Sequence, residues 1–158
     1  MLLVWDDKKG LQILNDVAFE FLSKEKWELA EYCYNLLCKI PTIENEVKIN
    51  SRINYLNALK HIKGLEKTKE EIEQLDVTGM EKRFFVAKQL LLENNKLVLD
   101  SIDATYPYEF STYTILKWPI FIEFRKTEEF KEFIARHLDD FEEYEFDIKV
   151  SDHNAEAS

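Results

Sequence analysis

The chain has 158 residues, of which 46% are hydrophobic and 33% are charged, and its formal net charge at pH 7 is −10. This length and composition are typical of one globular domain with a sizeable core, while only three glycines and three prolines argue against a loop-rich or all-β fold. The excess of acidic groups argues against nucleic acids and anionic membrane surfaces as partners, because those polyanions would repel the protein.

The sequence contains neither a charged and then apolar leader nor an apolar run of about 18 residues. We therefore expect a soluble, cytoplasmic protein that does not span a membrane. Its two cysteines, Cys33 and Cys38, fall on different faces of one predicted helix, so they are not expected to form a disulfide with each other. Reduced thiols are the usual state of cysteine in the cytoplasm.

The N-terminal part of the chain has two different hydrophobic patterns, one before and one after about residue 14. Residues 1–5, MLLVW, are a short apolar run that predicts a strand or an extended lead-in. Residues 14–41 have the sharpest pattern of the chain, because apolar residues recur at helical spacing on both sides of a polar break. This pattern predicts two helices folded against each other, with small residues at Ala18 and Ala30 where the helices approach closely.

The order of residue types in this hairpin resembles a tetratricopeptide repeat, a helix pair that stacks into arrays. The matching residues are Leu14, Val17, Ala18, Phe21, Ala30, Tyr34, Leu37 and Pro41. The proline comes one residue earlier than in the family pattern. The resemblance implies an all-α fold of stacked antiparallel hairpins, in which the first helix of each hairpin lines a concave groove. An ordinary helix pair within another helical domain is the alternative.

A second hairpin is predicted from about residue 44. A long helix over 44–63 is followed by a break at Gly64 and then by a mostly charged helix that ends near Val77. Thr68 and Glu71 have the spacing of a capping box for this second helix. The hairpin matches the repeat pattern poorly, so we expect a degenerate repeat.

The third hairpin matches better. Thr78 and Glu81 are predicted to form another capping box, and the chain is expected to turn at residues 93–95. Its small residue Ala87 lies 69 positions after Ala18, which is about twice the 34-residue period of this repeat. The sequence therefore predicts about three hairpins.

Residues 115–134 resemble the closing segment of bacterial arrays of this repeat, whose aromatic side chains cover the exposed end of the stack. The matching residues are Pro119, Phe121, Arg125 and Phe130. Pro119 is expected to begin or kink a helix, and Thr127 to cap a last helix that runs to about Leu138. An unrelated amphipathic helix pair is the alternative.

The helical domain is expected to span residues 1–141, and residues 142–158 are expected to differ from it. Apolar and charged residues alternate over 143–150, which is a strand period. Such a strand could pair with residues 1–5, with a second copy of the chain in a homo-oligomer, or with a partner's sheet edge. A disordered acidic tail is the alternative.

Motifs for catalysis are largely missing. The sequence has no phosphate-binding glycine loop, no Cys or His spacing typical of a metal site and no nucleophile-elbow serine. Two weak candidates for metal chemistry are His137 with the acidic pair at 139–140, and a carboxylate-x-lysine element at 147–149; solvated surface charge is favoured for both. We therefore expect no enzyme activity, no cofactor and no metal.

One set of polar residues is organised by helical spacing. Its members recur at steps of four, three and four along the long middle helix, and they are Asn50, Asn54, Asn57 and His61. In an array of this repeat their shared face would line the groove together with Asn15, and asparagine amides can both donate to and accept from the backbone of an extended peptide. The candidates for contacts with acidic groups of the ligand are Arg52, Arg83 and Lys88. An ordinary polar helix face is the alternative.

The expected function is that of an adaptor or scaffold, which binds a protein or peptide partner through the concave groove. A different class is an acidic inhibitor or immunity-type protein, which would neutralise a basic partner enzyme by charge complementarity. A small nuclease or other hydrolase is a third, less favoured class.

Overall fold

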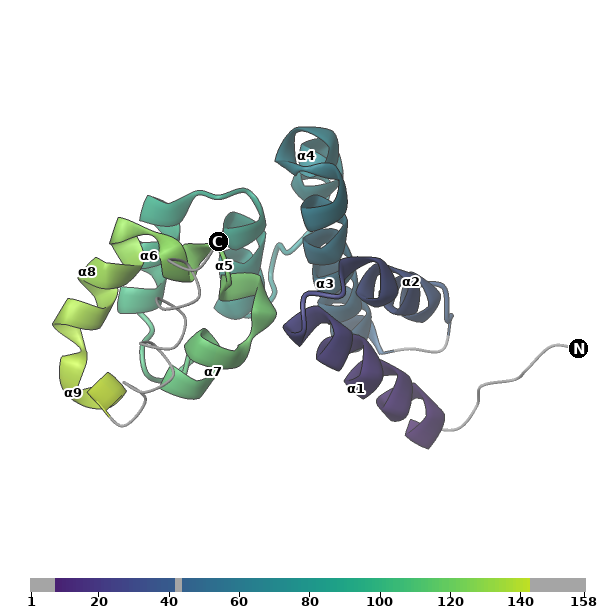
Figure 1. The fold of residues 1–158 in the computed structure, drawn as a ribbon, viewed down its shortest axis with the longest axis horizontal. Coiled ribbons are helices and arrows are strands. Elements are labelled where there is room, and N and C mark those ends of the chain that lie inside the picture. Colours follow the sequence, from purple (N-terminus) through teal and green to yellow (C-terminus); the bar gives the residue numbers. More distant parts are fainter. Residues whose placement is uncertain (1–7, 42–43, 143–158) are drawn as a thin grey trace, which may run out of the picture.

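The computed structural model describes residues 8–41 and 44–142, and in these residues the protein is all-helical (Figure 1). The α-helices are α1 (Lys8–Ser23), α2 (Trp27–Cys38), α3 (Asn45–Lys63), α4 (Leu65–Glu73), α5 (Lys82–Leu91), α6 (Asn95–Asp103), α7 (Thr112–Lys117), α8 (Glu128–Arg136) and α9 (Leu138–Phe141). Two 3₁₀ helices, η1 (Pro119–Phe121) and η2 (Phe124–Lys126), connect α7 to α8. The all-α prediction is confirmed for this part of the chain.

The strands expected at residues 1–5 and 143–150 lie outside the described residues, as does all of the expected tail except Glu142. None of the helices in the described part combines the length and the apolar character that crossing a membrane requires.

Helices α1 and α2 pack against each other, as the apolar pattern of the first hairpin predicts. Ala18 and Ala30 are both fully buried, and Tyr34 fills the space beside them without any exposed surface. The two cysteines are free thiols, which confirms that they do not pair. The turn between the helices places Glu25 at a φ of 54°, and the Lys26 amide donates to the Phe21 carbonyl at 2.8 Å.

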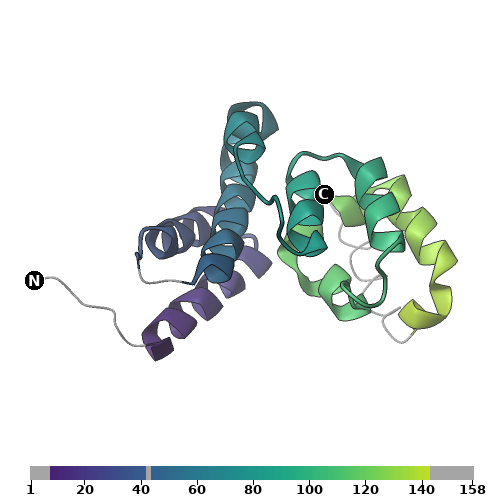
Figure 2. The ribbon, with the colours of Figure 1, turned by 180° about the vertical axis from the view of Figure 1, so that it is seen from behind.

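Helix α3 lies at the centre of the molecule, with α1 and α2 on one side and α5 on the other (Figures 1 and 2). Ala58 joins the smaller core that α1 and α2 form. Ile53, Leu56 and Leu59 belong to the larger core, which continues through α5, α6 and the C-terminal aromatic residues. Because both cores use residues of α3, this helix holds the two halves of the molecule together.

The capping box predicted at Thr68 and Glu71 is wrong. Helix α4 begins at Leu65, directly after Gly64, whose φ of 85° lets the chain leave α3 and reverse at once. Thr68 is consequently inside α4, where its buried hydroxyl donates to the Gly64 carbonyl at 3.0 Å. The helix ends at Glu73, earlier than predicted.

The capping box predicted at Thr78 and Glu81 is also wrong. Helix α5 begins at Lys82, and Glu81 is the residue before it, but its side chain makes no capping hydrogen bond to the backbone of the helix. Thr78 lies in the preceding turn, where its backbone N–H donates to the Asp76 carboxylate at 2.9 Å. The Thr78 backbone N–H is therefore bonded in a local Asx turn with Asp76.

Helices α5 and α6 form the third pair, and the chain turns between them at residues 92–94, one residue before the predicted 93–95. Lys60 of α3 connects to this turn although its side chain is buried. Its Nζ donates to the Leu91 carbonyl at 3.3 Å and lies 3.2 Å from a Glu93 carboxylate oxygen. The buried ammonium thus caps the C-terminal end of α5 and retains a charged partner.

The segment after α7 packs as a chain of aromatic rings. Pro119 begins η1, as expected, and Phe121, Phe124 and Phe130 meet edge to face with centroid distances of 6.3 and 5.9 Å. Arg125 donates from one nitrogen to the carbonyls of Ile115 and Trp118, at 3.0 and 3.3 Å. Burial lowers the pKa of Arg125 to about 10, so the group stays cationic at neutral pH.

Thr127 caps α8 as predicted, because its hydroxyl accepts from the Phe130 amide at 3.2 Å. The helix ends at Arg136, and Leu138 begins the short α9 instead of ending α8.

We predict that Thr127→Ala lowers the free energy of unfolding by about 1 kcal/mol, because the Phe130 amide loses its acceptor. Thr127→Ser keeps a hydroxyl at the cap and should retain most of the stability. Urea denaturation followed by circular dichroism measures both variants. Equal stability of the serine and alanine variants would contradict the assigned cap.

Candidate functional site

A cavity of about 590 Å³ opens between α1, the first half of α3, the start of α5 and the segment around α7. Residues of α1 and of α7, two helices that Figure 1 shows on opposite sides of the middle of the molecule, both line it. We refer to this cavity as the groove. Its apolar lining residues are Leu11, Phe19, Leu37, Val47, Phe110 and Trp118. Its uncharged polar lining residues are Gln12, Asn15, Asn50, Asn54 and Thr114. Its charged lining residues are Glu44, Arg83 and Glu109.

The structure brings four of the eight predicted site residues together in the groove, and they are Asn15, Asn50, Asn54 and Arg83. The other four, Arg52, Asn57, His61 and Lys88, do not line it. Asn15 comes from α1, and Asn50 lies one helical turn before Asn54 on α3. The spacing of four along α3 therefore does place two amides on the face that lines the groove.

Asn54 uses both ends of its amide for internal hydrogen bonds. Its Nδ2 donates to the Tyr34 hydroxyl at 3.2 Å, and its Oδ1 accepts from the Trp118 indole N–H at 3.2 Å. Only 7% of Asn54 is exposed, and burial raises the pKa of the Tyr34 phenol. Asn54 therefore joins α2, α3 and the end of α7 at the base of the groove.

Arg83 lines the groove but is already paired within the protein. Its guanidinium forms ion pairs with Glu46 and with Glu81, the latter at 2.9 Å. It also lies over the ring of Phe84, 4.8 Å from the ring centroid. The positive charge of Arg83 is therefore largely neutralised before any ligand arrives.

Arg52 and Lys88 make internal contacts of other kinds. Arg52 forms an ion pair with Glu71 at 2.9 Å and lies over the Tyr55 ring at 4.9 Å. The Lys88 ammonium donates to the carbonyls of Glu73 and Leu75, both at 2.7 Å. Lys88 thereby caps the C-terminal end of α4, where backbone carbonyls have no helical partner.

Asn57 and His61 continue the polar stripe of α3 but are covered by neighbouring helices. Asn57 is 2% exposed, and its Nδ2 has no hydrogen-bond partner among the described residues. The His61 ring stacks on Trp27 of α2, with the centroids 3.8 Å apart and the planes within 4°. Burial lowers the pKa of His61, and the nearby Glu123 opposes this effect.

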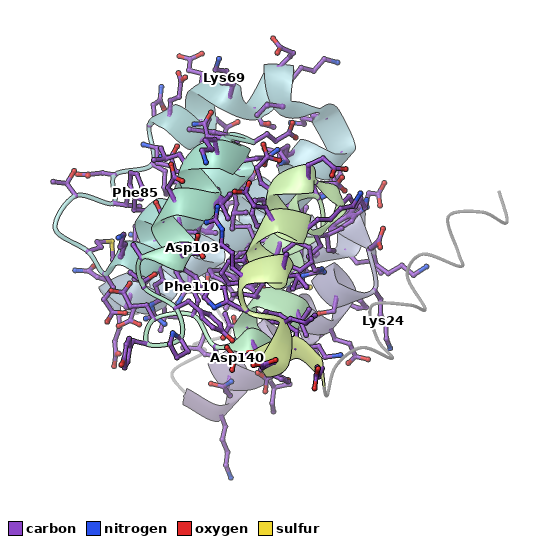
Figure 3. The ribbon with its side chains drawn as sticks, turned by 90° about the vertical axis from the view of Figure 1, so that its left-hand side faces the viewer. Lys24, Lys69, Phe85, Asp103, Phe110 and Asp140 are labelled. Atoms are coloured by element: carbon purple, nitrogen blue, oxygen red, sulfur yellow. The ribbon has the colours of Figure 1, made fainter. Side chains whose placement is uncertain are left out.

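The side of the groove that the segment around α7 forms was not predicted from the sequence. Phe110, labelled in Figure 3, is fully buried, and Trp118 lies in the range 115–134 that the sequence assigns to the closing segment. The acidic residues Glu44 and Glu109 carried no pattern that distinguished them from the other carboxylates of the chain. These residues line the same cavity as α1 only because of the tertiary packing, which the sequence pattern did not encode.

The described residues contain no group of three or more His, Cys, Asp or Glu side chains that could hold a metal ion. His137 does not combine with the acidic pair at 139–140; instead its Nε2 lies 2.9 Å from an Asp103 carboxylate oxygen. Asp103 also pairs with Arg136. The element at 147–149 lies outside the described residues.

No family model, no curated protein and no solved structure matches this chain. The resemblance to tetratricopeptide repeats thus rests on the residue pattern alone. The site is interpreted below from its own geometry and chemistry.

We predict that Asn54→Ala lowers the free energy of unfolding by about 1–3 kcal/mol, because the Tyr34 hydroxyl and the Trp118 indole N–H lose their shared partner. Asn50→Ala is the matched control, since Asn50 lies one turn away on the same helix and makes no side-chain hydrogen bond to the described residues. Chemical denaturation of both variants gives the comparison. Equal destabilisation would mean that Asn54 does not have the structural role assigned to it.

We predict that stability falls with acidification because of His61. The ordinary pKa of histidine is about 6.5 and burial lowers the pKa of His61 in the folded protein, so below about pH 6.5 the unfolded chain binds more protons. The free energy of unfolding should therefore decrease as the pH drops below about 6.5 and level off below the folded pKa, with no contribution above that range.

The variant His61→Phe keeps an aromatic ring against Trp27 and removes the titration. Unfolding free energies of both proteins, measured between about pH 5 and 8, should diverge only on the acidic side. A constant difference across this range would refute the role given to His61.

Proposed function

We propose that this protein is an adaptor or scaffold that binds an extended segment of a partner protein in the groove. The observation that carries this proposal is the groove itself, a cavity of about 590 Å³ lined by apolar side chains and by several amides. Cavities of about 300–1,000 Å³ with a few placed polar groups are typical of ligand sites. The proposal includes no catalytic role.

The helix order supports a repeat-like arrangement. Helices α1 and α2, α3 and α4, and α5 and α6 are three successive packed pairs, and α3 also contacts α1 and α5. The first helix of each pair contributes lining residues to the groove. We propose that these pairs act as a short tetratricopeptide-like array, with the segment after α7 closing the end of the larger core.

Two amides are suited to hold a peptide backbone. Asn15 and Asn50 line the groove from different helices, and neither side chain makes a hydrogen bond to the described residues. Each amide has donors and an acceptor available for the alternating N–H and C=O groups of an extended chain. Phe19 and Val47 lie beside them with 37% and 41% of their surfaces exposed, which leaves apolar area for ligand side chains.

A second candidate function is an acidic inhibitor that neutralises a basic enzyme in the cytoplasm, favoured by the net charge of −10. The two functions differ in their salt dependence. Binding through the charge of the whole surface weakens steeply as salt is raised, whereas binding through apolar and amide contacts in a groove weakens little.

We predict that Asn15→Ala combined with Asn50→Ala weakens partner binding about thirtyfold, because two hydrogen bonds of about 1 kcal/mol each are lost. The matched control is Asn35→Ala combined with Asn95→Ala, since these asparagines lie on α2 and α6 and do not line the groove. Partners captured from the native host by the tagged wild-type protein would be purified and titrated against all three proteins by calorimetry. Equal affinities, or binding that disappears on raising salt, would favour the inhibitor.

A further inference from the structure

The charges around the groove indicate the chemistry of its ligand. Glu44, immediately before α3, and Glu109, in the connection that precedes α7, both line the groove and are both exposed. Neither carboxylate has an ion pair or a side-chain hydrogen bond within the described part of the chain. These two carboxylates are therefore available to a cation on a ligand.

The positive charge at the groove, unlike these two carboxylates, is already paired within the protein. Arg83 is its one basic lining residue among those described, and it is paired with Glu46 and Glu81. Together with Glu44 and Glu109 these groups leave the groove with a net negative charge. A ligand carboxylate placed here would meet this negative charge, whereas an ammonium or guanidinium would be attracted.

The other two basic candidates support the same conclusion. The sequence predicts that Arg52, Arg83 and Lys88 contact acidic groups of the ligand. Arg52 and Lys88 do not line the groove, and both are engaged elsewhere, with Glu71 and with the carbonyls at the end of α4. The basic residues that would bind an acidic ligand are thus used to hold the protein's own helices.

We propose that the ligand of the groove is an extended peptide segment in which lysine or arginine side chains flank apolar ones. This inference rests on the proposed function and specifies its partner. The apolar side chains would pack against Phe19 and Val47, and the basic ones would pair with Glu44 and Glu109. The amides of Asn15 and Asn50 would hold the peptide backbone between them.

The test is a selection of random 12-residue peptides displayed on phage, with the wild-type protein immobilised. The same selection is run on a charge variant, Glu44→Gln with Glu109→Gln. A matched control, Glu28→Gln with Glu66→Gln, changes the net charge equally at two exposed positions of α2 and α4 outside the groove. Synthetic, fluorescein-labelled versions of the enriched peptides are then titrated by fluorescence anisotropy.

We expect the wild-type protein and the control to enrich peptides with apolar residues beside lysine or arginine, and the charge variant to lose this basic preference. An enriched basic peptide should bind the charge variant about three- to tenfold more weakly, since exposed ion pairs contribute modestly. Its affinity for the control should stay within about twofold of wild type, because distant surface charges are screened at physiological salt.

Two other outcomes are distinguishable. Enriched peptides that are acidic or uncharged, and that lose affinity on Asn15→Ala with Asn50→Ala, would overturn the basic ligand while the peptide-binding function stands. If no peptides are enriched, or if their binding is unchanged by the asparagine substitutions, the proposed function falls and this inference falls with it.

Discussion

The burial of α3 from two sides is the constraint on which the rest of the structure depends. A helix in this position must present apolar residues in more than one direction, and its polar residues must find partners inside the protein. Ala58 faces one core while Ile53 and Leu56 face the other. Asn54 and Lys60 extend to the elements around them, so the polar groups of α3 also position its neighbours.

The groove follows from this arrangement. Asn54 bonds to the Tyr34 hydroxyl on one side and to the Trp118 indole on the other, so α2 and the end of α7 are both fixed to α3 at the base of the groove. One turn earlier, Asn50 faces the open space that remains between the walls. Two asparagines one turn apart on α3 therefore differ in role. The Asn54 side chain bonds to neighbouring elements, whereas the Asn50 side chain can contact a ligand.

Sequence periodicity was sufficient to predict the helical hairpins, because burial of an apolar face is decided largely within each helix. It was not sufficient for the capping boxes, since Gly64 lets α4 begin at Leu65, three residues before Thr68. Within the polar stripe, spacing placed Asn50 and Asn57 on one face but could not show that Asn57 is buried while Asn50 lines the groove. Likewise, the sequence identified Lys88 as a cation without indicating the carbonyls that it binds.

Unlike α3, helix α4 is exposed along most of its length. Of its residues, only Thr68 and Ile72 are buried, and it lies at one end of the molecule, where Lys69 projects at the edge (Figures 1 and 3). Most of its surface touches neither core and none of it lines the groove. Substitutions at its exposed positions should therefore be tolerated, and a fluorophore or an affinity handle attached at Lys69 would leave the groove and both cores undisturbed.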